Sequence, residues 1–238
     1  MKIVTKFCKP EMEPTEVLML GLFENTKKIP AELTSCNKAS GELLSHLLNN
    51  RDFCGKLNET MLIPTYHKIS PKRILLVGLG KPELFLLDKI RQAFGTASRV
   101  MQTKRISSFS IFLGTYNDAS IEDSVRSIVE GVLLSLYNFT RYKNLEKEEK
   151  CDVSSFSLLT GDKSILDTVK ATAKSAQTIA EAVCFTRDIV NMSGSDATPT
   201  FLANKAREIA KQSDIKCTIL SKPDLKKIGM GGILSVSR

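Results

Sequence analysis

Short apolar runs alternate with longer segments of helical spacing over the first 160 residues, and this alternation limits the possible folds most strongly. Six runs have the length and pattern of strands: 2–7, 17–23, 60–63, 73–77, 109–113 and 153–159. Three longer segments carry apolar residues at helical spacing: 40–49, 84–102 and 120–136. Because strands and helices alternate in this order, the sequence predicts an α/β domain, with a mixed sheet flanked by helices, over residues 1–160.

Two helix starts are marked by capping residues. Ser120 and Asp123 have the S-x-x-[DE] spacing of a capping box, in which each side chain bonds to the backbone of the other residue. Thr198 and Pro199 place a capping threonine before a proline at the first helical position. We therefore expect one helix to begin after Ser120 and another at Pro199.

A long helix is predicted to begin near Asp162 or Ser164 and to run to about Asn191. Apolar residues recur on one of its faces: Ile165, Val169, Ala173, Ala176, Ile179 and Val183. Its many alanines suit close packing or a connection between domains. We assign residues 161–192 to a connecting helix on this basis. The charged stretch before it, from Lys143 to Asp152, is predicted to be an exposed loop.

The last part of the chain, residues 193–238, is predicted to begin a second, incomplete α/β unit. Lys216 to Leu220 and Gly231 to Val236 have strand patterns. A short helix is predicted between them at 222–228, and Gly229 ends it. The chain therefore divides into a domain, a connecting helix and the start of another unit.

The chain is basic, but its charge is diffuse. The formal net charge is +8, and Lys and Arg are spread along the whole sequence. A nucleic-acid site usually shows these residues clustered on one face or helix, so the charge permits nucleic-acid binding without supporting it. With no Trp and 6% aromatic residues, aliphatic side chains must fill the core.

The six cysteines predict neither a zinc site nor a disulfide framework. No two of them form a C-x-x-C pair, and the chain has only two histidines, His46 and His67. We interpret the cysteines as reduced thiols of a cytoplasmic protein. No window approaches 18 apolar residues and the first residues lack a secretory pattern, so we expect no membrane partner.

A glycine-rich segment after the fourth predicted strand invites a phosphate-loop interpretation. Gly78-Leu79-Gly80-Lys81 lacks the glycine that a Walker loop needs at position 75 and the Ser or Thr that it needs at position 82. A dinucleotide fingerprint would need Gly at position 83, where Glu stands. We interpret the segment as a turn out of a strand, with a weak anion contact through its backbone N–H groups as the alternative.

No other residue pattern indicates catalysis. His46 and His67 have no Cys or acidic residue at ligand spacing. Glu181 and Asp188 lie two helical turns apart, about 10 Å, which is too far for a shared ion or a coupled acid–base pair. The sequence contains no G-x-S-x-G. It therefore predicts no catalytic, metal-binding or substrate-binding residue in this chain.

Four segments together carry a family resemblance. The segment 185–206, FTRDIVNMSGSDATPTFLANKA, contains T-R-D-I-V-N, then a turn, then T-P-x-x-L-A. Residues 130–143 contain E-G-x-x-L and F-x-x-Y-K, residues 77–81 read VGLGK, and residues 225–236 read LKKIGMGGILSV. In their order along the chain, 77–81, 130–143, 185–206 and 225–236, the segments resemble the leucine (cytosol) aminopeptidase family. The matches in the first segment are Thr186, Arg187, Asp188, Val190, Asn191, Thr198, Pro199, Leu202 and Ala203.

The resemblance implies an N-terminal domain similar to macro domains, a connecting helix and a catalytic peptidase domain. It implies a cytoplasmic hydrolase that removes N-terminal amino acids from peptides, usually as a homo-hexamer. It also implies two divalent metal ions, Mn or Zn, in the complete enzyme. Such an ion pair activates a water molecule to attack the scissile carbonyl.

The chain departs from the family where the chemistry lies. The family's metal-binding and catalytic motifs, G-K-G-[VI]-x-[FY]-D-[ST]-G-G and N-T-D-A-E-G-R-L, do not occur. We expect them beyond Arg238, so that this chain is an N-terminal portion that binds no metal and is inactive alone. The alternative function is a macro-like module that binds nucleotide, ADP-ribose or DNA, with Val77 to Lys81 as a contact.

Overall fold

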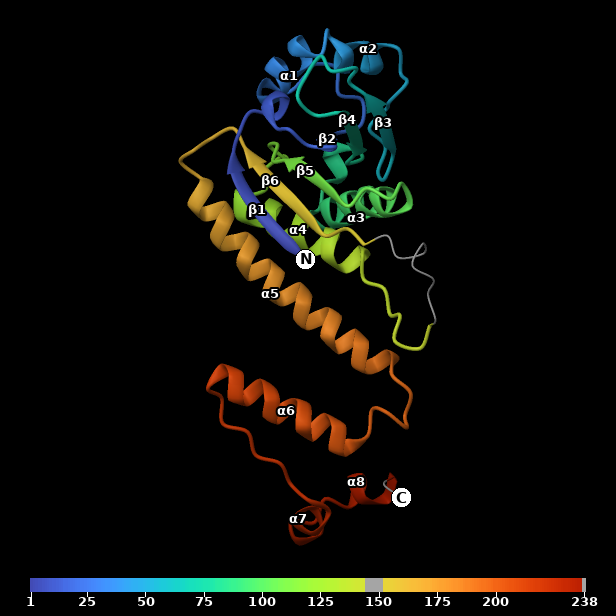
Figure 1. Ribbon diagram of the computed structural model, residues 1–238, viewed down its shortest axis with the longest axis vertical. Helices are drawn as coiled ribbons and strands as arrows, with labels where there is room; N and C mark the ends of the chain where they lie inside the picture. Colours follow the sequence, from blue (N-terminus) through green and yellow to red (C-terminus); the bar gives the residue numbers. More distant parts are fainter. Residues whose placement is uncertain (144–151, 237–238) are drawn as a thin grey trace. The chain divides into compact units, whose positions relative to one another are not determined.

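The chain forms two compact units, Met1–Thr186 and Arg187–Arg238, in a computed structural model that describes residues 1–143 and 152–236 (Figure 1). The loop predicted at 143–152 falls almost wholly outside the described residues. Among the described residues, no helix is both long enough and apolar enough to cross a membrane.

The first unit is built on a six-stranded mixed sheet, as predicted. Its strands are β1 (Lys2–Phe7), β2 (Val17–Leu22), β3 (Thr60–Pro64), β4 (Arg73–Gly78), β5 (Ser108–Phe112) and β6 (Ser155–Thr160). Their order across the sheet is β1-β6-β5-β2-β4-β3, and only β3 runs antiparallel to its neighbour. All six predicted strands are confirmed, with ends shifted by at most two residues.

Helices cover both faces of this sheet (Figure 1). One face packs against α3 (Leu87–Thr103), α4 (Ile121–Ser135) and α5 (Leu166–Asn191), and the other against α1 (Thr34–Ala39) and α2 (Leu43–Asn49). Short 3₁₀ helices complete the unit: η1 (Pro10–Met12), η2 (Ala31–Leu33) and η3 (Pro82–Leu84).

Two predicted helix starts were early. The helix predicted from residue 40 begins at Leu43, because Gly41 and Glu42 adopt left-handed backbone conformations with φ of 77° and 59°. The helix predicted from Leu84 begins at Leu87, after the 3₁₀ turn that Pro82 opens. The short helix α1, six residues long, has no apolar pattern in the sequence that predicted it.

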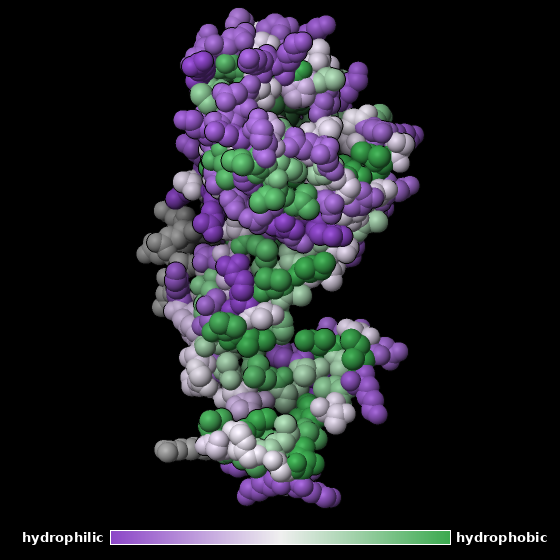
Figure 2. Space-filling model, turned by 180° about the vertical axis from the view of Figure 1, so that it is seen from behind, coloured by the Kyte–Doolittle hydropathy of each residue, from purple (hydrophilic) through white to green (hydrophobic). Residues whose placement is uncertain are grey.

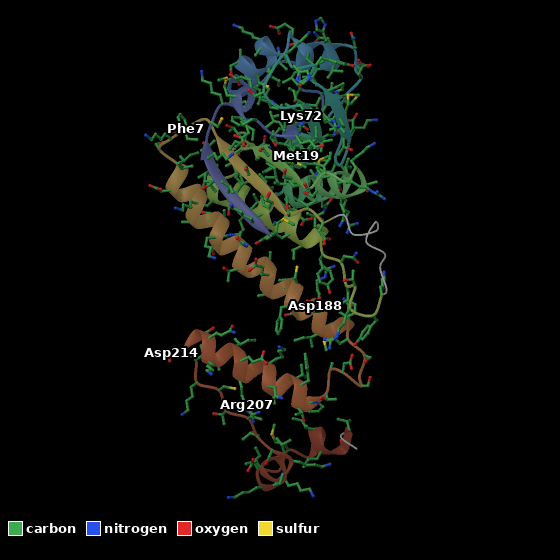
Figure 3. The ribbon with its side chains drawn as sticks, in the orientation of Figure 1. Phe7, Met19, Lys72, Asp188, Arg207 and Asp214 are labelled. Carbon is green, nitrogen blue, oxygen red and sulfur yellow. The ribbon has the colours of Figure 1, made fainter. Side chains whose placement is uncertain are left out.

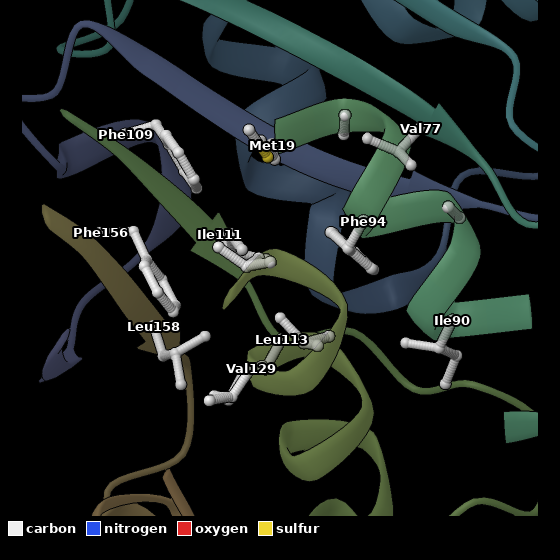
Figure 4. Packing of buried hydrophobic residues seen from close by; sticks show 14 of the residues in the cluster. Met19, Val77, Ile90, Phe94, Phe109, Ile111, Leu113, Val129, Phe156 and Leu158 are labelled. Atoms are coloured by element: carbon white, nitrogen blue, oxygen red, sulfur yellow. The ribbon is translucent and has the colours of Figure 1, made fainter. Parts of the chain in front are cut away.

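The two core layers follow from the alternation of side chains along each strand. In β2, Val17 and Met19 point to the layer with α3 and α4, whereas Leu18 and Leu20 point to the layer with α1 and α2. Figure 4 shows the first layer, where the rings of Phe109 and Phe156 stack with centroids 5.7 Å apart. Aliphatic side chains fill most of both layers, as the scarcity of aromatics requires.

The long helix α5 packs through small residues. Val169, Ala173, Ala176 and Ala180 are buried, which confirms the predicted close packing. The sequence predicts Ile179 and Val183 on the same face, but they are 47% and 40% exposed, so that part of the prediction is wrong. They lie beside the buried stripe, which continues through Ala180 instead.

Among the described residues of the second unit, the regular structure is helical. The helices of this unit are α6 (Pro199–Ser213), α7 (Lys222–Lys227) and α8 (Gly231–Val236). Thr198 caps α6, because its hydroxyl accepts a hydrogen bond from the Phe201 amide at 3.2 Å. Gly229, with φ of 75°, follows the end of α7. These two features confirm the predicted start and end signals.

Both strands predicted in the second unit are wrong. Residues 216–220 have no regular structure, and residues 231–236 form the helix α8. A strand needs a neighbouring strand for its backbone hydrogen bonds, and the described part of this unit contains none. A helical turn satisfies these groups locally, so the short apolar segment at 231–236 becomes helical.

Candidate functional site

The place where this type of sheet usually binds ligands is the crevice between β2 and β5. After β2 the chain builds β3 and β4 on one side, and then returns across β2 to build β5 on the other. Loops at the carboxyl ends of the strands diverge at such a reversal of strand order, which makes it the usual ligand position in open α/β sheets. The loop after β2 and the loop after β5 border this crevice.

The crevice is nearly filled. Its cavity measures about 40 Å³, which is room for about two or three water molecules. Pockets for small ligands are commonly about 300–1,000 Å³. Tyr116 and Glu32 are among the side chains that line it. The crevice is therefore closed to a nucleotide in this conformation.

Polar contacts hold the loop after β5 in place. The Tyr116 hydroxyl accepts a hydrogen bond from the Gly114 amide at 3.4 Å, and Glu32 Oε1 accepts one from the Thr115 amide at 3.0 Å. Tyr116 is 2% exposed, and burial raises the pKa of its hydroxyl far above the ordinary value. A neutral phenol and a carboxylate that bonds to the backbone make a structural contact, not an acid–base pair.

The glycine-rich turn after β4 is closed to anions as well. The amides of Gly78, Leu79 and Gly80 donate to the carbonyl oxygens of Glu59, Leu22 and Gly55, at 2.8–2.9 Å. These are the donors that an anion would need, and the protein backbone already uses them. The interpretation as a turn is confirmed, and the alternative of an anion contact loses its donors.

The sequence did not reveal why this turn needs its first glycine. A Cβ on Gly78 would lie 1.9 Å from the carbonyl oxygen of Lys56, because the loop at 53–59 crosses the end of β4. Gly80 has φ of 78°, a conformation that L side chains rarely adopt. The two glycines therefore let the loop at 53–59 pass close to the backbone at the end of β4. In the sequence, only the position of the glycines directly after a strand could have suggested this close approach.

The remaining residues considered from the sequence lie apart from one another. His46 is on α2 and His67 is in a loop, and both are exposed. Glu181 accepts a hydrogen bond from Gln177 one turn away on α5, at 2.8 Å, and Asp188 lies further along the same helix (Figure 3). Among the described residues, these four side chains belong to no group of three or more that could hold a metal ion.

A half-buried ion pair that the sequence did not indicate joins β1 to the segment after η1. Lys6 Nζ donates to Glu13 Oε1 at 2.7 Å, and the Glu13 side chain is 5% exposed. The Ser110 hydroxyl also donates to this oxygen, at 3.4 Å. The contacts link β1, the segment after η1 and β5. They satisfy the buried carboxylate and serve as structural bonds.

The described residues do not fit the two-ion centre that the family resemblance implies. Among residues 1–143 and 152–236, no group of three or more His, Cys, Asp and Glu side chains could hold a metal ion. A pair of divalent ions needs several such ligands around each ion. We therefore derive no catalytic step through metal ions in this chain.

Comparison with known families gives two matches along the chain. Residues 19–145, which are more than half of it, match the N-terminal domain of the cytosol aminopeptidase family. Residues 184–238 match the catalytic domain of the same family. The two matches fall in the order that the resemblance predicts.

Individual relatives agree with these matches. A probable cytosol aminopeptidase of Geotalea uraniireducens is 34% identical over 203 residues, which cover 85% of this chain and 41% of the relative. A probable cytosol aminopeptidase of Geobacter sp. is 31% identical over 238 residues, which cover the whole chain and 48% of the relative.

A solved structure shares the fold. A variant of tomato leucine aminopeptidase superposes with a TM-score of 0.76 at 22% identity, over 96% of this chain and 46% of that protein. The chain thus spans about half the length of the curated relatives it matches. With a family match over more than half of its residues, the chain belongs to the cytosol aminopeptidase family.

Proposed function

We propose that this chain forms the N-terminal part of a metallo-aminopeptidase that removes amino acids from the amino end of peptides. The observation that carries the proposal is the pair of family matches, first the N-terminal domain and then the catalytic domain, along one chain. In this proposal residues 1–160 are the macro-like N-terminal domain, 161–192 the connecting helix and 193–238 the start of the catalytic domain.

The chain's own role in this proposal is structural. The crevice between β2 and β5 is closed, and the described residues contain no group of three or more His, Cys, Asp and Glu side chains for the pair of Mn or Zn ions. We therefore propose that the ion pair and the substrate site belong to parts of the enzyme that residues 1–238 do not supply. The relatives, which are about twice as long as the chain, support this division.

We further propose that the enzyme is cytoplasmic and a homo-oligomer, a hexamer as the family resemblance implies. The relatives' name, cytosol aminopeptidase, supports the first point. The second unit supports further protein contacts, because apolar side chains gather at its surface (Figure 2). Examples are Ile215 at 62% exposed, Ile228 at 57% and Val236 at 84%.

A chimera tests the proposed activity. Residues 1–238 are joined to the remaining catalytic part of the Geobacter sp. relative, and hydrolysis of leucyl p-nitroanilide is measured with Mn²⁺ and with Zn²⁺. The intact relative is the positive control. We expect turnover by the chimera and none by residues 1–238 alone. A folded chimera without activity would contradict the proposed function, and turnover by residues 1–238 alone would contradict the proposed division of roles.

The alternative function, a module that binds nucleotide, ADP-ribose or DNA, has less support. The crevice measures about 40 Å³, and the backbone donors of Gly78, Leu79 and Gly80 are in use. For DNA, the net charge of +8 permits binding but does not support it. Titration calorimetry with ADP-ribose, for which we expect no heat, and gel shifts at two salt concentrations separate these alternatives from the aminopeptidase.

A further inference from the structure

The first strand of the sheet has a free edge. β1 is the end strand, and within the described sheet it pairs only with β6. An edge strand presents a row of backbone N–H and C=O groups that another chain can pair with. Proteins bind extended peptides at such edges by adding a strand to the sheet.

The register of β1 shows which groups face outward. The Lys2 amide donates to the Ser154 carbonyl and the Cys8 amide to the Thr160 carbonyl, both at 3.0 Å. Because backbone groups alternate along a strand, the even-numbered residues of β1 bond to β6. The N–H and C=O groups of Ile3, Thr5 and Phe7 therefore point away from the sheet, about 6.8 Å apart from one to the next.

A groove lies beside this free edge. Its walls are residues 3–5 of β1 and the first three turns of α5, from Leu166 to Gln177, and its volume is about 470 Å³. Gln177 Nε2 donates to the Met1 carbonyl at 3.0 Å and ties the helix to the start of the strand. Phe7, 52% exposed, stands at the other end of β1 (Figure 3). The groove therefore runs along the strand, between an edge strand and a helix.

The charge around the groove is mainly positive. Lys170 and Lys174 line it from α5, and Lys2 is exposed on β1. Asp167 is the one acidic residue among the described groove walls. In the part of the chain that the structure describes, none of these three lysines forms an ion pair. The groove therefore has unneutralised positive charge directly beside unpaired backbone groups.

We propose that the groove between β1 and α5 binds an extended acidic peptide segment of another protein, which adds a seventh strand to the sheet at β1. The outward backbone groups of Ile3, Thr5 and Phe7 pair with the peptide, and Lys170 and Lys174 pair with its carboxylates. A second copy of this chain fits the groove less well, because its β1 would bring the same lysines against each other.

The probe is a blocked, fluorescein-labelled peptide of seven alternating Glu and Val residues, and its matched control has Lys in place of Glu. Binding to the full chain is followed by fluorescence anisotropy at two salt concentrations. We expect saturable binding of the acidic peptide that weakens with salt, and no binding of the basic one. Equal binding of both peptides, or of neither, would overturn the proposal.

Backbone pairing is tested by hydrogen exchange of single amides. With the acidic peptide bound, the Ile3 and Thr5 amides should become protected, while the Val4 amide, already bonded to β6, should change little. Binding without this protection would overturn the proposed strand addition. A protein dimer that forms without peptide and protects the same amides would assign the edge to a second copy instead.

Two variants locate the site. Thr5→Pro removes an outward amide that the β1–β6 ladder does not use, a position where an edge strand tolerates proline. Thr5→Pro should weaken peptide binding about tenfold, whereas Thr5→Ala should leave it unchanged.

The second pair of variants tests the charge of the groove. Lys170→Glu should weaken peptide binding about fivefold. Lys163→Glu, at a residue outside the groove walls, is the control and should leave binding unchanged. Since the lysine variants leave β1 intact, unchanged affinity in Lys170→Glu would overturn the proposal even if Thr5→Pro failed to fold.

Discussion

Gly131 of α4 lies against the main chain of Arg91 on α3: a Cβ atom built on the glycine would be 2.4 Å from the Arg91 carbonyl oxygen. The neighbouring Glu130 accepts a hydrogen bond from Arg91 Nε at 2.6 Å. Gly95 of α3 lies close to the Gly131 carbonyl, because a Cβ atom built on Gly95 would be 3.1 Å from the oxygen of that carbonyl. The two helices therefore approach each other closely through small residues, on the main core layer of the first unit.

The first prediction concerns this crossing. Gly131→Ala should lower the free energy of unfolding of the first unit by about 1–3 kcal/mol, because the added methyl group forces the two helices apart. The matched control is Gly161→Ala, whose Cβ would make an ordinary contact of 3.7 Å with the Phe112 ring. Urea denaturation followed by circular dichroism measures both. If the two variants lost the same stability, the close crossing would not be the cause.

The second prediction concerns the buried thiol of Cys36. Burial, with a smaller contribution from Glu11, raises the pKa of this thiol from 9.0 to about 12. Below pH 9 the thiol keeps its proton in the folded and in the unfolded chain, so its contribution to the free energy of unfolding does not change with pH. Above pH 9 the unfolded chain loses the proton while the folded chain retains it, so stability should fall between pH 9 and 12.

Urea midpoints at pH 8 and pH 10.5 measure this effect. In Cys36→Ala the decrease in stability between pH 8 and pH 10.5 should be smaller than in the parent chain. Some decrease should remain, because the pKa of the Tyr116 hydroxyl is also raised by burial. An independent measurement is alkylation by iodoacetamide at pH 8, where the exposed Cys217 should react far faster than Cys36. Equal pH dependence in the variant and the parent would show that Cys36 does not contribute.

The third prediction concerns the cap of α6. Thr198→Ala removes the hydroxyl that accepts from the Phe201 amide and should cost the helix about 1 kcal/mol. The amide of Phe201 should then exchange faster with deuterium. Thr200→Ala, an exposed position in the first turn of the same helix, is the control and should leave this exchange rate unchanged. The same increase in both variants would mean that the hydroxyl of Thr198 is not the cap.

Much of the first unit could be predicted from the sequence, because the central strands β2, β4 and β5 are buried and the start of α4 carries a capping residue. The Ser120 hydroxyl accepts from the Asp123 amide at 3.0 Å, which is one of the two bonds of the predicted capping box. The Asp123 carboxylate accepts from the Ser120 hydroxyl at 2.9 Å in place of the second bond, to the Ser120 amide. The second unit was harder, because the segments at 216–220 and 231–236 contain the apolar residues of strands but have no partner strand among the described residues. Short apolar runs do not distinguish a strand from a helix by their pattern alone.

The features of the candidate site depend on contacts between residues that are far apart in the sequence. The turn at Gly78 was predictable as a turn, but the crossing of Lys56 behind it involves residues more than 20 positions apart, which no local pattern reveals. The closed crevice at Tyr116 has the same origin, since Glu32 and Thr115 meet only in the folded sheet. Family membership, in contrast, was readable from four short segments, because their order along the chain is specific.

Residues 1–238 alone are expected not to hold the pair of metal ions. To test this, the purified chain is incubated with Mn²⁺ and with Zn²⁺, free metal is removed by gel filtration, and the ions that remain per chain are counted by plasma mass spectrometry. We expect far fewer than one ion per folded chain. Two ions per chain, lost when acidic residues of this same chain are replaced, would show that these residues do hold the ion pair.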